Sequence, residues 1–177
     1  MVGTTVGDYT IASRLPVGSR GETWLAHDTT LNRTVALTIL TSSLTLDQST
    51  RVAFLQRARA AAAVDHPNIA SIHGAGELPD GGLWVARGWS GGRSLREREK
   101  TGPLPLDEAV DIAVQAGRGL QRASQAGLVY GNLGPDDLVI TDGGQTLIYG
   151  EFRKGMEEAT SDIEGLGSML REMISVE

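Results

Sequence analysis

Apolar and polar positions alternate in the first part of the chain in a way that predicts short strands joined by tight turns. Alternating or β-branched runs occupy residues 9–14, 22–27 and 34–40. Two further strands are expected near 69–76 and 82–88, on either side of the turn sequence Pro-Asp-Gly-Gly. The first 88 residues therefore predict an antiparallel sheet.

One helix interrupts these strands. Residues 47–64 are rich in alanine, which has the highest helix propensity, and Asp47 is placed to cap the amino end. The sequence His66-Pro67-Asn68 is expected to end the helix, because a residue that precedes proline avoids the α region.

Beyond residue 93 the pattern becomes helical. Ser94 is placed to cap a short helix that runs to Glu99, and residues 106–126 have an apolar stripe at helical spacing. A hairpin of two short strands is predicted over 138–149, around the turn Asp-Gly-Gly. A final amphipathic helix is expected over 161–174, with Ser161 or Asp162 as its cap.

Composition narrows the class of protein. The 177 residues suit one domain or two small lobes, and the net charge of −6 argues against nucleic acid or an anionic membrane as the main partner. No apolar run reaches the roughly 18 residues of a membrane span, and no signal peptide opens the chain. Cysteine is absent and the three histidines lack metal-ligand spacing. We expect a cytoplasmic domain.

Several short motifs, taken in order, resemble those of a protein kinase. They are the strand Val-Ala-Leu-Thr-Ile-Leu at 35–40, His66-Pro67-Asn68-Ile69, Leu133-x-Pro135, and Ser161-Asp162 with Leu166-Gly167. Over residues 8–174 the chain is similar to actinobacterial Ser/Thr protein kinases of the receptor type. The resemblance implies an α+β, two-lobed kinase-like fold, with residues 1–89 as the sheet lobe and 90–177 as a shortened helical lobe.

Residues that perform catalysis in that family are replaced here. The Lys that pairs with the ATP phosphates corresponds to Thr38, and its Glu partner on the helix corresponds to Arg57. A hydroxyl cannot supply the charge-assisted bond of a Lys. For Arg57 the two interpretations are a surface residue on a rotated helix and a compensating phosphate ligand.

The catalytic loop and the metal-binding motif also depart from the family. Asn132 stands at the position of the catalytic base, Asp137 at that of the metal-binding Asn, and Gly150 at that of the metal-binding Asp. An amide cannot act as a general base at neutral pH. Asp137 retains an oxygen ligand for a cation, although a solvated turn is the alternative. About ten residues separate Gly150 from the last motif, too few for an activation segment.

The nucleotide-binding motifs are degenerate as well. The glycine-rich loop keeps Gly18 and Gly21 but has Pro16 at the first glycine, so an ordinary hairpin turn is as good an interpretation as a phosphate cradle. Arg87 corresponds to the gatekeeper residue beside the adenine pocket. A buried Arg there would exclude the adenine and would require a hydrogen-bonding or charged partner. A one-residue shift of register would instead leave Arg87 exposed.

The sequence therefore predicts a pseudokinase that has no bound cofactor and acts as a regulatory scaffold. Two alternatives stay open: an atypical kinase that uses Arg20 as a substitute cation, and a domain that binds nucleotide without turnover. The chain also resembles the cytosolic kinase-homology domains of mycobacterial MviN/MurJ-type cell-wall lipid flippases. That resemblance implies a membrane tether outside this segment, phosphorylation by a Ser/Thr kinase, and a forkhead-associated-domain partner that reads a phosphothreonine, for which Thr160 is the candidate.

Overall fold

The computed structural model of the chain describes residues 1–18, 21–40, 47–131, 133–150 and 159–175; the side chains of 159–161 lie outside this description. The elements are β1 (Thr5–Val6), β2 (Tyr9–Leu15), β3 (Glu22–Asp28), β4 (Arg33–Leu40), α1 (Gln48–Ala62), β5 (Ile72–Glu77), β6 (Leu83–Gly88), β7 (Arg93–Ser94), α2 (Leu95–Glu99), α3 (Leu106–Gln125), β8 (Leu138–Ile140), β9 (Thr146–Ile148) and α4 (Ala159–Ile174).

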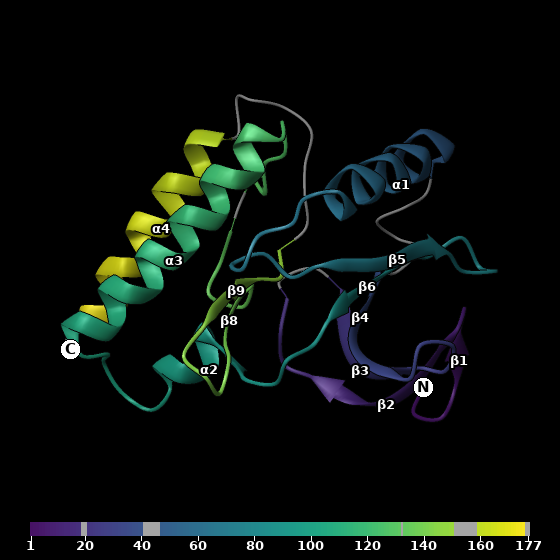
Figure 1. Cartoon of the computed structure of the whole chain (residues 1–177), viewed down its shortest axis with the longest axis horizontal. Helices are drawn as coiled ribbons and strands as arrows, with labels where there is room; N and C mark the ends of the chain where they lie inside the picture. The colour runs from purple at the N-terminus through teal and green to yellow at the C-terminus, as the bar shows by residue number, and fades with distance from the viewer. Residues whose placement is uncertain (19–20, 41–46, 132, 151–158, 176–177) are drawn as a thin grey trace.

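Two sheets divide the chain into two lobes. The first six strands form an antiparallel sheet in the order β1-β2-β3-β4-β6-β5, and the chain then crosses over residues 89–92 to a three-stranded sheet, β7-β8-β9. Figure 1 shows the first sheet with α1 on one side of the molecule, and α3 and α4 together on the other. The molecule has an α+β fold of two lobes, as the sequence predicted.

Each lobe has its own apolar core. In the first lobe the side chains of Ile11, Val35 and Leu37 are almost fully buried between neighbouring strands. In the second lobe the inner face of α3 packs with the hairpin and with Met169 and Met173 of α4. Among the described residues, no helix is both long enough and apolar enough to span a bilayer.

The caps of two helices were predicted correctly and that of a third was not. Asp47 accepts a hydrogen bond from the Thr50 amide at 2.7 Å, and Ser94 accepts one from the Glu97 amide at 3.2 Å. The last helix, however, begins at Ala159, so neither Ser161 nor Asp162 is its cap. Asp162 lies within the first turn, and its carboxylate accepts hydrogen bonds from the amides of Tyr130 and Gly131.

Two predicted boundaries also differ from the structure. Helix α1 ends at Ala62, before His66 and Pro67, so the proline does not terminate it directly. Strand β5 begins at Ile72 rather than 69, because Ile69 forms a parallel bridge with Ile148 of the other lobe.

Asn68 joins the two lobes at this point. Its buried side-chain amide donates to Gln115 Oε1 at 3.0 Å and to the Thr146 carbonyl at 2.9 Å. Its own carbonyl accepts from the Ile148 amide at 3.0 Å. One side chain therefore binds α3 and the hairpin to the segment that precedes β5.

We predict that Asn68→Ala lowers the free energy of unfolding by about 1–3 kcal/mol, because the buried Thr146 carbonyl and the half-buried Gln115 side chain each lose a donor. Chemical denaturation measures the change. Gln56→Ala, at an exposed position on α1, is the control and should change stability by less than about 0.5 kcal/mol. Equal stabilities of the two variants would contradict the role of Asn68 in connecting the two lobes.

Candidate functional site

Apolar side chains from both lobes form one cluster in the cleft between them. Val17, which follows β2, is 4% exposed and packs in one cluster with residues of the first sheet and of the hairpin. The buried members of this cluster are Val17, Ala36, Ala70, Val139, Leu147 and Tyr149, and Leu15 and Trp89 pack against them. The two lobes therefore contact each other through side chains across the cleft.

A main-chain hydrogen bond closes the cleft beside Val17. The Gly18 amide donates to the Asp136 carbonyl at 2.7 Å. Gly18 and Gly21 have φ angles of +86° and +90°, and a Cβ at Gly21 would lie 2.4 Å from the Ile39 carbonyl oxygen. Both glycines of the degenerate loop thus allow the loop to approach the protein's own backbone closely.

Thr38 forms a neutral pair at the position of the family's Lys. Its hydroxyl lies 3.0 Å from that of Thr23, its register partner on β3, and both side chains are buried. Arg57 on α1 is not an exposed surface residue: it is half-buried, and its buried Nε–H has no hydrogen-bond partner among the described residues. The prediction of a surface position for Arg57 is therefore confirmed only in part.

Arg87 is buried at the back of the cleft, with 3% of its surface exposed. It pairs in register with Ala36 of β4, and its Nη2 donates to the Gly150 carbonyl at 3.3 Å. Its buried Nη1 has no hydrogen-bond partner within the part of the chain that the structure describes. The alternative in which Arg87 is exposed was wrong.

Two tyrosines surround this guanidinium. Burial raises the pKa of Tyr130 and of Tyr149 well above the ordinary range, and the positive charge of Arg87 opposes the effect in both. The Tyr149 hydroxyl donates to the Gly88 carbonyl at 2.6 Å, and its ring meets Trp89 edge-on at 5.6 Å. Tyr149 therefore links the hairpin to the segment that connects the lobes.

Gly150 leaves no room for a side chain. A Cβ there would lie 2.8 Å from the Tyr130 ring and 3.1 Å from a methyl group of Leu133. The aspartate that binds metal in the resembled family thus does not fit this position in the present packing. Glu151 and Phe152, which follow it, lie outside the described residues.

Asp137 lies in a turn, as the alternative interpretation had it, but its side chain is buried rather than solvated. Its Oδ2 accepts a hydrogen bond from the Gly134 amide at 3.0 Å, and its carbonyl accepts one from the Tyr149 amide at 2.7 Å. Asn132 lies outside the described residues. Thr160 lies in the first turn of α4 and is not its cap, since the helix begins at Ala159; its side chain is outside the description.

The residues of the cleft do not fit an adenine nucleotide with its metal ion. Val17 and Tyr149 cover the apolar floor, Thr38 brings no charge, and Gly150 cannot be replaced without a clash. A hollow of about 440 Å³ remains outside the loop, where Arg14, Arg96 and Lys100 stand beside Glu22, Glu97 and Asp136. Within the described residues, each of these three positive side chains forms an ion pair with one of the three acidic ones.

The sequence did not identify Val17, Tyr149 or Asp162 as important to the site. The only local signal for Val17 is an apolar residue within a Pro-x-Gly turn, where a polar residue is usual. Tyr149 had the ordinary appearance of a strand residue. Val17 clusters with residues more than a hundred positions later in the chain. The Tyr149 hydroxyl bonds Gly88, 61 residues earlier, and Asp162 bonds amides 31 and 32 residues earlier.

No protein-family model matches the chain. The chain is 35% identical over 153 residues to the serine/threonine-protein kinase PknA of Mycobacterium tuberculosis, an alignment that covers 83% of this chain and 36% of PknA. It is 27% identical over 173 residues to PknJ of the same species, which covers 95% of this chain and 29% of PknJ. The chain thus spans about a third of the length of these relatives.

Solved structures agree with this similarity. The crystal structure of the Mycobacterium tuberculosis PknI kinase domain superposes with a TM-score of 0.74 at 28% identity, covering 84% of this chain and 61% of that one. The sequence matches and the superposition cover both lobes described above. The chain is therefore homologous to the kinase domains of mycobacterial Ser/Thr protein kinases.

Proposed function

We propose that this chain is a pseudokinase: a kinase-like domain that does not transfer phosphate and instead acts as a regulatory scaffold. The observation that supports this most directly is the apolar cluster in the cleft. Val17 belongs to one apolar cluster with Val139 and Tyr149, where the resembled family binds adenine, and the Gly18–Asp136 hydrogen bond holds Gly18 beside it. A ligand would have to displace these contacts before it could bind.

The chemistry of phosphoryl transfer favours the same proposal. Catalysis in kinases depends on positioning the nucleotide and on neutralising charge on the transferred phosphate. Thr38, Asn132 and Gly150 stand where the family has its Lys, its base and its metal-binding Asp. These groups act on one transition state, so replacing all of them leaves no residue to stabilise it. The competing proposal, an atypical kinase that uses Arg20, lacks any other residue in a catalytic role.

We predict that millimolar ATP–Mg leaves the melting temperature unchanged. A ligand at 100 times its Kd adds about 2.7 kcal/mol of apparent stability, which for a chain of this size corresponds to roughly 5–10 °C. Thermal melts with and without ATP–Mg test this, with the PknA kinase domain as the positive control. A shift of several degrees would favour the alternative of a domain that binds nucleotide without turnover.

We also predict that Thr38→Lys gives no kinase activity, because Asn132 and Gly150 still lack a carboxylate. Transfer of radiolabelled phosphate to a general protein substrate is the measurement. If the unaltered chain transfers label and Arg20→Ala abolishes the transfer, the atypical-kinase alternative holds and the pseudokinase proposal fails.

The finer part of the proposal concerns regulation. We propose that a genuine Ser/Thr kinase phosphorylates the chain and that a forkhead-associated domain involved in cell-wall synthesis binds the phosphothreonine. Thr160 is the candidate because it lies in the first turn of α4, where the helix dipole favours negative charge. Attachment to a membrane protein such as a lipid flippase stays a prediction from the sequence resemblance.

The regulatory proposal predicts that PknA phosphorylates the chain at Thr160 and that Thr160→Ala loses both the phosphate and the binding of a forkhead-associated domain. Mass spectrometry locates the phosphate, and titration calorimetry measures binding before and after treatment. Thr101→Ala, at an exposed threonine in the turn after α2, is the control. Phosphate incorporation and binding that survive in Thr160→Ala would place the site elsewhere.

A further inference from the structure

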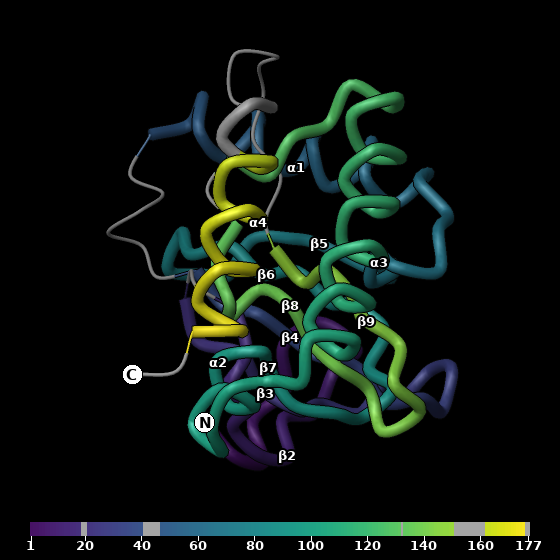
Figure 2. The backbone as a smooth tube through the Cα atoms, turned by 90° about the vertical axis from the view of Figure 1, so that its left-hand side faces the viewer, coloured from purple at the N-terminus to yellow at the C-terminus, as the bar shows by residue number. Residues whose placement is uncertain are grey.

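Helices α3 and α4 expose an apolar face. Nine large apolar side chains are exposed among the described residues, and five of them lie on these two helices, so the exposure is concentrated there. The five are Leu106, Val110 and Val114 on α3, with 64%, 45% and 44% of their surface exposed, and Ile163 and Ile174 on α4, with 69% and 40%. Figure 2 shows α3 and α4 side by side on the face turned to the viewer.

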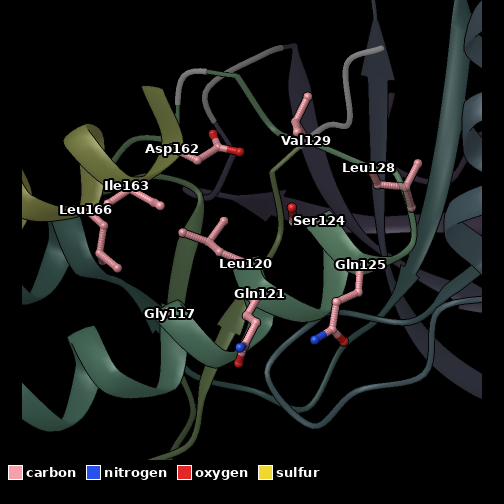
Figure 3. A pocket seen from close by; sticks show the side chains of 10 residues that line it. All are labelled: Gly117, Leu120, Gln121, Ser124, Gln125, Leu128, Val129, Asp162, Ile163 and Leu166. Carbon is pink, nitrogen blue, oxygen red and sulfur yellow. The ribbon is translucent and has the colours of Figure 1, made fainter. Parts of the chain in front are cut away.

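A groove of about 510 Å³ runs between the two helices at one end of this face. Figure 3 shows Ile163 and Leu166 of α4 on one side and Leu120 of α3 facing them. Gly117 lies in its wall, and Gly167 on α4 has open space where a Cβ would be. Small residues on both helices allow another helix to approach closely.

Beside the apolar stripe of α3, the acidic residues precede the basic ones along the helix. Asp107 and Asp111 lie in the first half of the helix and Arg118 and Arg122 in the second, all on one side of the stripe. None of the four forms an ion pair within the described part of the chain. If a second copy of α3 packs against the first in the opposite direction, Asp111 meets Arg118 and Asp107 meets Arg122.

Helix α4 has the same arrangement. Glu164 and the exposed Arg171 are also seven residues apart, with the acidic residue first. An antiparallel copy of α4 therefore pairs Glu164 with Arg171. Because residues seven apart share a helix face, these charges can meet while the apolar stripes are in contact.

A single twofold axis can pair the charges of α3 and those of α4 at the same time. The two helices run in opposite directions, since the Leu104 amide, before α3, bonds the Met173 carbonyl near the end of α4. Leu166 lies 3.9 Å from the Cβ position of Gly117. Along α3, Gly117 lies about 4 Å beyond the midpoint between Asp111 and Arg118, at 1.5 Å per residue. Along α4, Leu166 lies about 2 Å before the midpoint between Glu164 and Arg171. Because the helices are antiparallel, these two displacements point in the same direction. The two midpoints therefore lie at nearly the same level.

We propose that this face binds a second copy of the chain, with the α3–α4 pair of each protomer packed on that of the other around a twofold axis near Val114. Self-complementary charge is the hallmark of such an isologous interface, because each residue meets the partner's counterpart across the axis. The face is about 30 Å long and 20 Å wide, or roughly 600 Å², which approaches the ~800 Å² per partner of a stable interface. The proposal is independent of the pseudokinase proposal.

The first test is a charge swap, read by sedimentation equilibrium at micromolar concentrations. We predict that the unaltered chain is a dimer and that Asp111→Arg or Arg118→Asp raises the dimer dissociation constant at least tenfold. The double variant Asp111→Arg/Arg118→Asp should restore the dimer. Asp65→Arg, the same change of charge at an exposed position of the other lobe, is the control and should have no effect.

The second test uses the absence of cysteine from the chain. Val114→Cys lies near the axis, so two copies should approach within the ~7 Å between Cα atoms that a disulfide allows, and oxidation should give a covalent dimer. Val52→Cys on α1, with a matched exposure of 45%, should remain monomeric on a denaturing gel. The proposal fails if the unaltered chain is a monomer, if the swap does not restore the dimer, or if both cysteine variants cross-link equally.

Discussion

The relative position of the two lobes depends on the buried amide of Asn68. This group binds Gln115 of α3 and Thr146 of the hairpin, while its backbone pairs with Ile148, so the segment before β5 cannot move without both. A buried amide group whose nitrogen makes two hydrogen bonds resists displacement, since each lost bond leaves a polar group without a partner. The hairpin is thereby held close enough to the first sheet for Val17 to contact Tyr149.

Most elements of the fold could be predicted from the sequence because their signals are local. Strand alternation, the caps Asp47 and Ser94, and the apolar stripe of α3 each depend on neighbouring residues. The errors occurred where distant segments decide the outcome. Ile69 pairs with Ile148 instead of extending β5, and Asp162 binds the loop after α3 instead of capping its own helix.

At the candidate site, the replaced residues could be predicted from the sequence, but the packing around them could not. Departures from the family motifs, such as Thr38, are visible in the sequence alone. What occupies the vacated space is a matter of three-dimensional packing, and the contact of Val17 with Val139 has no local signal. Arg87 lies between these cases: its position was predicted, but its burial against the Gly150 carbonyl followed only from the structure.

The hydrogen bond between Gly18 and Asp136 also constrains the order in which the chain can fold during synthesis. The ribosome makes the loop first, yet its acceptor lies 118 residues later, which at about 5–20 residues per second means a delay of roughly 6–24 s. Throughout that interval Leu15 and Val17 have no second lobe to cover them. Cleft closure is therefore a late event in biogenesis, and the nascent first lobe carries an exposed apolar edge that a chaperone can bind.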